Sequence, residues 1–580
     1  MKTSYILFFR SKGLRLGILA ALGLLACTSI NAQISGSYTI DRNGTASATV
    51  YKSFKAVIDD LKGVTRSDGG TANNTGSGVT GNATFTVKVG SGPYTWTSAD
   101  QLVIPSIGTM SSTKTVTFKG NNETINYTGS SSNRPAIRLD DADWFRFDSL
   151  KIYSLATSSA WGIHFKNSAD NNIIQNCVVR CPNVASEAAG NYSSNSGCIV
   201  FSTENASLNG FDSYGWGGAA AFGNNGNNNI IRNNSIGGKD DGTSSGTGPA
   251  FGVFLLGTTS GTGSASNLVE KNNITNCFYY SVYCGFADGA EIKKNNITNP
   301  EAAPYNWGAA AIYSNYLDNS TGQTVNTTKQ TKISQNRIYK NHINQNTAYY
   351  YYGIYAYDAG NAGTVIDNNA MYDIQTSSVI YGIYAYGYPG RNLKFEHNTF
   401  SYDHPTQTNS PTVYGIFNLT QSNFTADYQN NIISMTQPGG TGTRYGIYDY
   451  NWGGSTYNYN NVYVNRNNGG TPATNDYYGY KGSTKKALSD WQAAGSGAQS
   501  TEFASTFVDW ATGDLRPLSF ELNNTGRNLG YTKDINDSNR TVATPDKGAF
   551  EVKIDASCTA FPWTGLNECG NYTEVVKVTI

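Results

Sequence analysis

Apolar residues recur along the chain in a short pattern centred on asparagine. The pattern reads apolar-x-x-Asn-x-apolar, and eight clear copies are followed by a weaker ninth copy at Asn460. The asparagines of the clear copies are Asn176, Asn234, Asn272, Asn295, Asn336, Asn369, Asn398 and Asn431. The spacings through the ninth copy are 58, 38, 23, 41, 33, 29, 33 and 29 residues. Internal repeats of about 20–50 residues indicate a stacked architecture, so the pattern predicts a repeat fold.

A second pattern, a small residue followed by an aliphatic and then an aromatic one, alternates with the first. Its copies are Gly162-Ile163-His164, Gly252-Val253-Phe254, Ser281-Val282-Tyr283, Ala311-Ile312-Tyr313, Gly353-Ile354-Tyr355, Gly382-Ile383-Tyr384, Gly415-Ile416-Phe417 and Gly446-Ile447-Tyr448. Three of the last four copies begin 16 residues before their asparagine, and the fourth begins 14 residues before it. This nearly constant phase indicates that both patterns belong to one repeating unit.

The segments that carry these patterns predict short strands, because they alternate in polarity and are rich in Ile, Val and Tyr. No helical periodicity separates them, which argues against alternating strands and helices. Repeats of this kind bury their apolar face by stacking on like repeats, so the strands should be parallel, about three to a coil. The sequence therefore predicts an all-β solenoid of about nine or ten coils over residues 140–465. A β-propeller is the weaker alternative, because its blades need about 40–50 residues at regular spacing.

Strand alternation gives each row of side chains a direction. The aliphatic residues of the second pattern should stack in the core. Each motif asparagine should point inward at a turn, where stacked amides can hydrogen-bond from coil to coil. The aromatic residue after each aliphatic one must then face outward.

The outward aromatic row is the candidate binding surface. The row begins at His164 and Phe254, and its predicted ligand-binding residues are Tyr283, Tyr313, Tyr355, Tyr357, Tyr384, Tyr386, Phe417, Tyr448 and Tyr450. Exposed apolar strips of this size mark interaction sites, and flat rings with hydroxyl rims suit sugars. The alternative is that each ring packs on its stacked neighbour and only stabilises the sheet.

Both ends of the predicted solenoid carry candidate caps. A short amphipathic helix is expected over residues 53–62, with Ser53 as N-cap and an apolar face made of Phe54, Val57, Ile58 and Leu61. Strands near residues 85–89, 102–104 and 115–118 should lead into the first coils, and the repeat fades after Val464. The sequence predicts a leader at residues 1–32, an N-terminal cap with the first strands at 33–139, and the repeats at 140–465. An irregular C-terminal cap is expected at 466–553, with a short helix near 488–491. Residues 554–580 are expected to be a tail or the start of a further module.

The composition supports a folded β protein. The chain holds 63 Gly and 40 Tyr with only 14% charged residues. Many aromatics and little charge argue against disorder, and Gly and Tyr are poor helix formers. Residues 1–32 hold four of the 41 basic and none of the 41 acidic residues, so their removal leaves a net charge of −4. Such a chain has no electrostatic reason to bind nucleic acid.

The N-terminus predicts export. Four basic residues precede an apolar run over Leu16–Ala26, and Ile30-Asn31-Ala32 offers a cleavage site before Gln33, the layout of a secretory signal peptide. A membrane-spanning helix is the weaker alternative because the run is short. A second alternative is lipid modification of Cys27. No later stretch is apolar enough to cross a bilayer, so the mature protein is expected to be secreted or held at the outer cell surface.

Of the eight cysteines, Cys558 and Cys569 lie close together near the C-terminus, and a disulfide between them is plausible in an oxidising compartment. The other cysteines form no Cys-x-x-Cys pair and the chain holds four His, which argues against a zinc site. We expect no bound metal or other cofactor.

These repeats resemble those of right-handed parallel β-helix proteins of the pectate-lyase-like superfold. The segment Asp534-Ile535-Asn536-Asp537-Ser538-Asn539-Arg540 with Thr544-Pro545-Asp546-Lys547-Gly548-Ala549-Phe550 resembles the closing signature of secreted Bacteroidetes β-helix proteins. The opening Gly36-Ser37-Tyr38-Thr39-Ile40 and the helix after Tyr51 resemble their start, so the likeness covers roughly residues 34–553. The resemblance implies a right-handed fold and type IX secretion through a further sorting domain. Because the chain ends at Ile580 within a strand-like segment, either a module follows or export takes another route.

Enzymes that share the resemblance use clustered carboxylates, and lyases among them bind Ca²⁺. Asp367 and Glu396 lie two positions before consecutive motif asparagines, so they should stack about 5 Å apart with His397 beside them. Such a trio could share a proton or bind Ca²⁺, whereas the alternative is two solvated side chains on a polar face. Two functions stay open: a non-catalytic protein that binds an extracellular glycan or surface component, and a polysaccharide lyase or glycoside hydrolase.

Overall fold

The computed structural model describes residues 34–552, apart from residues 75, 157–159, 183–195, 204–222, 239–247, 259–262, 300–308, 319–322, 325, 343–349, 378, 388–391, 407–409, 421–424, 451–453 and 468. The leader with Cys27, the cleavage site before Gln33, and the Cys558–Cys569 pair lie outside the described residues.

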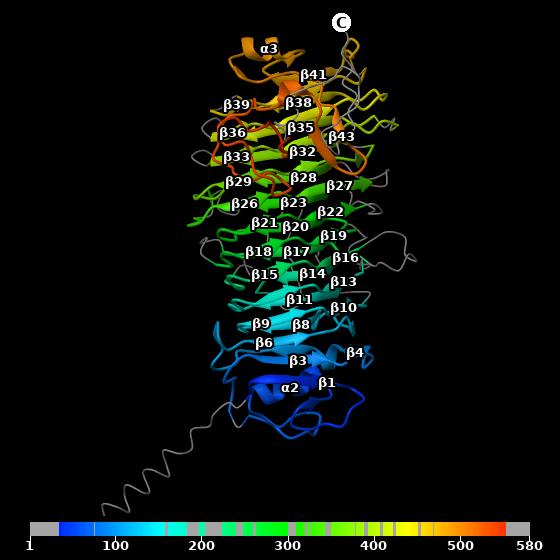
Figure 1. The fold of residues 1–580 in the computed structure, drawn as a ribbon, viewed down its shortest axis with the longest axis vertical. Helices are drawn as coiled ribbons and strands as arrows, with labels where there is room; N and C mark the ends of the chain where they lie inside the picture. The colour runs from blue at the N-terminus through cyan, green and yellow to red at the C-terminus, as the bar shows by residue number, and fades with distance from the viewer. Residues whose placement is uncertain are drawn as a thin grey trace, which may run out of the picture.

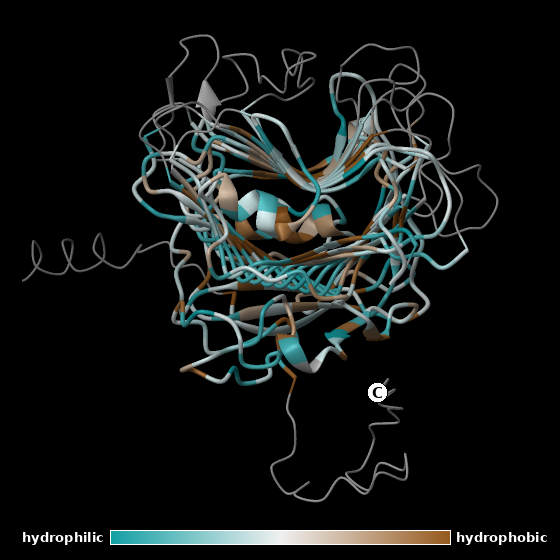
Figure 2. Ribbon diagram, turned by 90° about the horizontal axis from the view of Figure 1, so that it is seen from above, coloured by the Kyte–Doolittle hydropathy of each residue, from teal (hydrophilic) through white to brown (hydrophobic). Residues whose placement is uncertain are grey.

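The chain winds into a right-handed solenoid of three long sheets, named A, B and C, and each coil passes from A to B to C (Figure 1). Seen along its long axis, the strands of successive coils superpose (Figure 2). All pairs within sheets A and B are parallel, and so are those of sheet C except the last, β41 with β42. The predicted parallel β-helix is therefore confirmed.

Fourteen strands form sheet A, thirteen form sheet B and thirteen form sheet C. In spatial order, sheet A holds β2 (Val50–Tyr51), β1 (Gly36–Ile40), β3 (Ala83–Val87), β6 (Val116–Lys119), β9 (Phe145–Asp148), β12 (Ile173–Gln175), β15 (Ile230–Arg232), β18 (Leu268–Glu270), β21 (Glu291–Lys293), β26 (Thr331–Ser334), β29 (Thr364–Asp367), β33 (Asn392–Glu396), β36 (Thr425–Gln429) and β39 (Thr456–Asn458). Sheet B holds β4 (Tyr94–Thr97), β7 (Thr124–Thr128), β10 (Lys151–Ser154), β13 (Val178–Arg180), β16 (Ser235–Gly237), β19 (Asn273–Thr275), β22 (Asn296–Asn299), β27 (Arg337–His342), β30 (Ala370–Met371), β34 (Thr399–Ser401), β37 (Ile432–Met435) and β40 (Asn461–Val464), with β31 (Ile374–Gln375) also on β27. Sheet C holds β5 (Leu102–Ile104), β8 (Pro135–Asp140), β11 (Ala160–Lys166), β14 (Ser196–Phe201), β17 (Phe251–Leu256), β20 (Tyr280–Gly285), β23 (Ala309–Asn315), β28 (Tyr350–Tyr357), β32 (Val379–Gly387), β35 (Val413–Thr420), β38 (Arg444–Asp449), β41 (Asp476–Lys481) and β42 (Thr484–Lys485).

A few elements lie outside the three sheets. The helices are α2 (Phe54–Leu61), α3 (Leu488–Ala493) and the 3₁₀ turns η1 (Ser98–Asp100) and η2 (Phe520–Leu522). Two antiparallel hairpins pair β24 (Leu317–Asp318) with β25 (Gln323–Thr324) and β43 (Phe507–Asp509) with β44 (Asp514–Pro517). No helix in the described ranges is long and apolar enough to span a membrane.

The aliphatic stack of sheet C runs through the core as the pattern predicts. Ile354, Ile383 and Ile416 are consecutive partners in the register and are buried. The structure adds a copy that the pattern did not identify, since Ile199 lies between Ile163 and Val253. That copy ends in valine, not an aromatic residue, which is why it was missed.

The predicted asparagine ladder is present at the turn from sheet A to sheet B. Asn336 is representative: its backbone N–H and its Nδ2 both donate to Asn369 Oδ1, at 3.0 and 2.9 Å, and Nδ2 also donates to the carbonyl of Ile292. The same contacts repeat through Asn234, Asn272, Asn295, Asn336, Asn369, Asn398, Asn431 and Asn460. These buried amides thus satisfy one another from coil to coil.

The first copy of the asparagine pattern was assigned one residue too early. Ile174, not Ile173, pairs with Ile231, so Cys177 holds the ladder position that we predicted for Asn176. The backbone N–H of Cys177 donates to Asn234 Oδ1 at 2.9 Å, whereas Asn176 adopts a left-handed backbone conformation with φ of 54°. Two adjacent isoleucines made the register ambiguous by one residue.

A second, shorter amide ladder lies at the turn from sheet C to sheet A. It joins Asn172 to Asn229 and Asn229 to Asn267 through Nδ2–Oδ1 hydrogen bonds of 3.1 Å. Each of these asparagines lies five residues before a main-ladder position, a spacing that could have revealed them in the sequence.

The N-terminal cap agrees with the prediction. Ser53 Oγ accepts the N–H of Ala56, and Phe54 packs edge-on against Tyr94 and Trp96 at the end of the core. At the other end, Trp491 of α3 packs against Tyr457.

The predicted C-terminal cap is only partly correct. Residues 501–552, here called the strap, do not cover the end of the solenoid but run back along its side (Figure 1, orange and red). Asp537 of the strap forms a 2.7 Å ion pair with Lys294, which lies between β21 and β22. The strap therefore packs on the corner between sheets A and B.

Candidate functional site

The outer side of sheet C carries two rows of aromatic rings in its last five coils, here called the tyrosine face. One row is Tyr352, Tyr381, Tyr414, Tyr445 and Tyr477, and the other is Tyr355, Tyr384, Phe417, Tyr448 and Tyr480. Members of each row are partners in the register of β28, β32, β35, β38 and β41. The second row contains residues that we predicted, whereas the first row was missed.

A bend at a glycine turns both rows outward. A Cβ atom on Gly353 would lie 2.6 Å from the carbonyl oxygen of Gly382 and 2.7 Å from Met371 Sδ, so this position faces the core. Ile354 faces the core as well, which leaves Tyr352 and Tyr355 on the outside although they are three residues apart. Strict alternation could not predict this. The usable signal was the tyrosine that precedes the glycine in four consecutive copies, at positions 352, 381, 414 and 445.

The rings of the tyrosine face cover one another's flat sides. Within a row they stack nearly parallel: Tyr414 and Tyr445 lie 5.5 Å apart at 6°, and Phe417 and Tyr448 lie 5.0 Å apart at 6°. Between rows they meet edge to face, as Tyr445 and Tyr448 do at 84°. The expectation that flat ring faces are presented to a ligand is therefore wrong for these rings. The tyrosine face therefore presents ring edges and hydroxyl groups to a ligand.

The hydroxyl groups of the last coils are available to a ligand. Within the described part of the chain, those of Tyr445, Tyr448 and Tyr480 make no hydrogen bond. The three side chains are half-buried. Burial raises the pKa of Tyr445 and of Tyr448, so these two phenols stay protonated near neutral pH. Each can both donate and accept a hydrogen bond.

The predicted row does not continue as an exposed strip towards the N-terminus. Tyr283 and Tyr313 are 0% and 2% exposed, and His164 and Phe254 in the same row are also buried. These rings pack with Trp161, Phe251, Phe278, Tyr280 and Tyr316 in a second apolar cluster outside the solenoid core. The prediction of an exposed surface at Tyr283 and Tyr313 is therefore wrong, because bulky neighbours cover this half of sheet C.

The two-residue extension of the row is present in part. Tyr357 and Tyr386 are half-buried and stack at 4.6 Å and 7°, and Tyr450 is 55% exposed. Leu419 takes the position between Tyr386 and Tyr450.

The candidate catalytic residues come together as predicted but are covered. Asp367 and Glu396 are register partners at the ends of β29 and β33, yet they are only 6% and 5% exposed, and His397 is fully buried. Tyr531 of the strap donates a 2.5 Å hydrogen bond to Glu396 Oε2, and its ring meets His397 edge-on. Neither expected arrangement, an open catalytic group or a solvated pair, is found, because the strap lies over these residues.

Burial favours the uncharged forms of Asp367, Glu396 and His397. Burial raises the pKa of Asp367 to about 7, with the nearby Glu396 carboxylate acting in the same direction. Burial also raises the pKa of Glu396 against the opposing effect of its hydrogen bond from Tyr531. The pKa of His397 lies well below its ordinary value because of burial and the charge of Arg540. These pKa shifts are those expected of groups that are buried where the strap packs against the coils.

Polar contacts with the coils hold the strap at several points. Arg527 N–H donates to Asn430 Oδ1 at 2.8 Å, and Arg540 Nη2 donates to Asn368 Oδ1 at 2.6 Å. Apolar strap residues add a third cluster with the outer side of sheet B, comprising Phe507, Leu515, Leu522, Ile535, Ala549 and Phe550.

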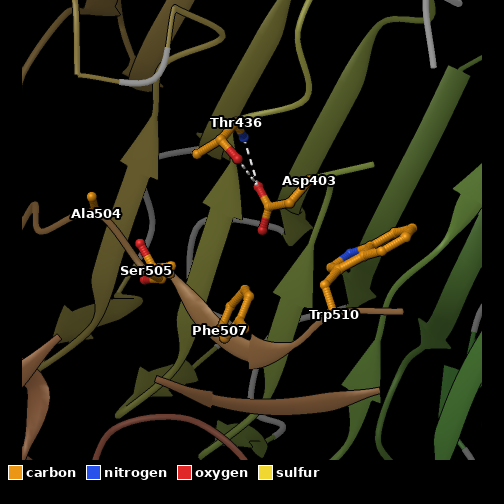
Figure 3. A pocket seen from close by; sticks show the side chains of 7 residues that line it. Asp403, Thr436, Ala504, Ser505, Phe507 and Trp510 are labelled. Carbon is orange, nitrogen blue, oxygen red and sulfur yellow. Dashed lines mark hydrogen bonds between the residues drawn. The ribbon is translucent and has the colours of Figure 1, made fainter. Parts of the chain in front are cut away.

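A small pocket lies between β43 and the turns of sheet B (Figure 3). Asp403, Thr436, Phe507 and Trp510 are among its lining residues. The Asp403 carboxylate already accepts hydrogen bonds from the N–H and Oγ1 of Thr436, at 2.6 and 2.8 Å. Hydroxyls of Ser401 and Ser434 also donate to it, so its acceptor capacity is used within the protein. Among the described residues, no group of three or more His, Cys, Asp or Glu is arranged to hold a metal ion.

Comparisons with known proteins agree with the fold. Residues 252–402 match the family model described as "Right handed beta helix region". No curated protein matches the sequence.

Several solved structures are similar at low identity. They include the pectate lyase Pel9A, with 12% identity, a TM-score of 0.41, and coverage of 90% of this chain and 98% of the lyase. PfbA, a surface adhesin of Streptococcus pneumoniae, shares 12% identity with a TM-score of 0.30 over 80% of this chain and 91% of the adhesin. The tailspike of E. coli bacteriophage HK620, solved in complex with a pentasaccharide, shares 9% identity with a TM-score of 0.30 over 78% of this chain and 72% of the tailspike. Likeness at this level carries no inference about ligand or reaction.

The three parallel sheets and the match over residues 252–402 together show that this chain has the right-handed parallel β-helix fold.

Proposed function

We propose that this protein is an exported, non-catalytic glycan-binding protein whose tyrosine face binds an extended, uncharged polysaccharide. The observation that carries the proposal is the double row of aromatic rings in register over five coils, in which the hydroxyl groups of Tyr445, Tyr448 and Tyr480 make no hydrogen bond within the described part of the chain.

The spacing of the face suits a polymer of sugars. Parallel strands of a sheet lie about 4.8 Å apart, so both rows repeat a ring edge at that interval, and the row of Tyr352 to Tyr477 also repeats a hydroxyl group. This interval is close to the length of one pyranose unit in an extended polysaccharide. A chain laid along the solenoid axis can therefore make the same contact at each sugar.

The chemistry of the face favours a neutral ligand. The two rows and the extension at Tyr357, Tyr386, Leu419 and Tyr450 contain no Asp, Glu, Lys or Arg. Lys486, whose ammonium lies 4.2 Å from the centre of the Tyr477 ring, donates to the carbonyls of Ala473, Thr474 and Asp476. Its charge is thus engaged within the protein, and an acidic polymer would find no cation in either row.

The covered state of Asp367, Glu396 and His397 favours binding over catalysis. Acid–base chemistry on a polymer requires the acting group to lie within hydrogen-bond reach of the bond that breaks. The strap occupies that space, so the lyase or hydrolase alternative, with its Ca²⁺, has less support.

The test measures retardation of the purified protein in gels that contain neutral or acidic polysaccharides. A triple variant, Tyr445→Phe, Tyr448→Phe and Tyr480→Phe, keeps the stacked rings and removes three hydroxyls. We expect a loss of affinity of about fivefold per hydroxyl, which corresponds to about 1 kcal/mol each. The matched control is Tyr153→Phe on sheet B, which should bind as the wild type does. Phe417→Tyr, which adds a hydroxyl within the row, should bind more tightly.

Three outcomes would contradict the proposal. Unchanged binding by the triple variant would remove the tyrosine face as the site. Preference for acidic polysaccharides would refute the neutral ligand. Release of new reducing or unsaturated ends, lost in Glu396→Gln, would establish the enzymatic alternative.

Export is part of the proposal and is tested separately. N-terminal sequencing of the mature protein should begin at Gln33. A lipid-modified Cys27 would place the protein on a membrane anchor instead, and an intact Met1 in the cytoplasm would refute export.

A further inference from the structure

Two buried cysteines lie inside the solenoid at the two ends of one connection. Cys181 directly follows β13 of sheet B, Cys198 lies in β14 of sheet C, and both side chains are fully buried. The thiol of Cys181 donates to the carbonyl of Gly197 at 3.5 Å, and the thiol of Cys198 donates to that of Val179, also at 3.5 Å. Each sulfur therefore lies near backbone that is within two residues of the other cysteine, and the Cys198 sulfur also lies 3.5 Å from the carbonyl oxygen of Gly237. Both cysteines are free thiols in this structure.

We propose that Cys181 and Cys198 form an intramolecular disulfide in the exported protein. The inference rests on the proposed export, because disulfides persist in oxidising compartments. It is independent of what the tyrosine face binds. The bond would close the connection between β13 and β14, one of the longer connections of the solenoid, and so restrict the unfolded chain.

The remaining described cysteines are engaged elsewhere. Cys177 holds a ladder position and its thiol donates to the carbonyls of Phe147 and Gln175. Cys284 contacts the hydroxyl of Tyr316 at 3.7 Å. Burial and the nearby Cys198 raise the pKa of Cys277, whose thiol donates to the carbonyl of Thr275, and Cys277 is the competing partner. The reciprocal backbone contacts of Cys181 and Cys198 favour their pairing over that competitor.

The chemistry is an exchange with an external disulfide donor. The thiolate of one cysteine attacks a sulfur of the donor, forms a mixed disulfide and releases one donor thiolate. The thiolate of the second cysteine then attacks the mixed disulfide, forms the Cys181–Cys198 bond and releases the second donor thiolate. The two protons lost by the cysteines end on the two donor thiols, and the donor is reduced. Because both thiols are buried once the coils close, exchange must precede closure of this coil during folding.

The test maps the cysteines of full-length protein expressed with an export leader and recovered from an oxidising compartment. The protein is denatured in iodoacetamide without reductant and digested with trypsin and a glutamate-specific protease. Trypsin leaves Cys181 and Cys198 on one peptide, because no Lys or Arg lies between Arg180 and Arg232, and cleavage after Glu187 separates them. We expect two peptides that stay linked until reduction, with neither cysteine alkylated, while Cys177 and Cys284 are alkylated. Alkylation of both Cys181 and Cys198, or a Cys198–Cys277 link, would overturn the proposal.

Variants then separate a covalent bond from packing. Cys181→Ser and Cys198→Ser should each lower the melting temperature, and the double variant should lose no more than either single variant. Each single variant should also release one alkylatable thiol. Cys284→Ser is the control, and it should leave the link between the two peptides intact. Additive losses in the double variant would indicate two independent packing contacts and no bond.

Discussion

The phenol of Tyr531 donates a 2.5 Å hydrogen bond to the carboxylate of Glu396, which lies 135 residues earlier in the chain. This contact places the strap over the stacked carboxylates of sheet A. Because the strap lies there, those carboxylates contact protein and not solvent.

Tyr531→Phe should loosen the strap without unfolding the solenoid. The substitution leaves Glu396 buried without its phenol donor, and an unsatisfied buried group costs about 1–3 kcal/mol. Hydrogen exchange of residues 501–552 should accelerate, while exchange in the asparagine ladder should not change. Tyr153→Phe serves as the control. Equal acceleration throughout the protein would show that the strap and solenoid unfold as one unit.

The two buried carboxyls should weaken attachment of the strap as the pH rises from about 4 to about 7. Burial raises the pKa of Asp367 from 3.8 to about 7, so its protonated form stabilises the folded state. That contribution is present below the unfolded pKa and is lost as the pH rises through the folded one. Glu396, whose pKa is also raised by burial, acts in the same direction.

Other groups that face Asp367 also affect how the stability of the strap depends on pH, so the experiment needs control variants. Arg540 and Lys332 lower the pKa of Asp367, and the buried His397, with its lowered pKa, destabilises the strap as the pH falls below about 6.5. Strap proteolysis should therefore be compared between wild type, Asp367→Asn and His397→Gln across this range. The difference between wild type and Asp367→Asn should grow with pH up to about 7. A difference that is constant with pH would contradict the assignment.

Asn336→Ala should be among the most destabilising substitutions in the repeats. It removes the acceptor of two Asn295 donors and the donor to the Ile292 carbonyl, all of them buried. Several unsatisfied groups together should cost roughly 2–5 kcal/mol. Denaturant unfolding measures the loss, with Asn296→Ala on the outer side of sheet B as control. A loss as small as that of the control would mean that the ladder contributes little.

Cys177→Asn should be tolerated, because the other coils carry asparagine at this ladder position. The Cys177 thiol already contacts the Phe147 carbonyl, the counterpart of the acceptor that ladder amides use one coil earlier. A new Nδ2 group would donate to that carbonyl and to Asn234 Oδ1. The melting temperature should stay the same or rise. A marked drop would show that this coil differs from the rest of the ladder.

Gly415→Ala should disturb the tyrosine face from the inside. A Cβ there would lie 2.5 Å from Ile433 Cγ2 and 2.6 Å from the Gly446 carbonyl oxygen. Overpacking of this kind costs about 1–3 kcal/mol and would shift the bend that sets Tyr414 and Phe417 outward. Both thermal stability and polysaccharide affinity should fall. Gly81→Ala, whose Cβ would meet ordinary contacts, is the control.

The sequence by itself determined the coil. Contacts such as those between Ile354 and Ile383, or between Asn336 and Asn369, belong to two motifs that recur along the chain and keep a nearly constant offset in the last four copies, so the repeat alone revealed both stacks and their inward direction. Where the periodicity was locally degenerate, as at Ile173 and Ile174, the register was assigned wrongly by one residue. Where a glycine bend broke the alternation, the row that contains Tyr381 was missed.

Only the tertiary structure decided what each outer face meets. Tyr313 and Tyr448 occupy equivalent positions of the repeat, yet the first is buried in a second apolar cluster and the second is half-buried on the outer face. Asp367 and Glu396 pair as the repeat predicts, but the strap that covers them arrives from residues 501–552. The physical reason is that stacking between neighbouring coils follows from local periodicity. What covers an outer face depends instead on side chains outside the repeat, and these can lie more than a hundred residues away in the sequence.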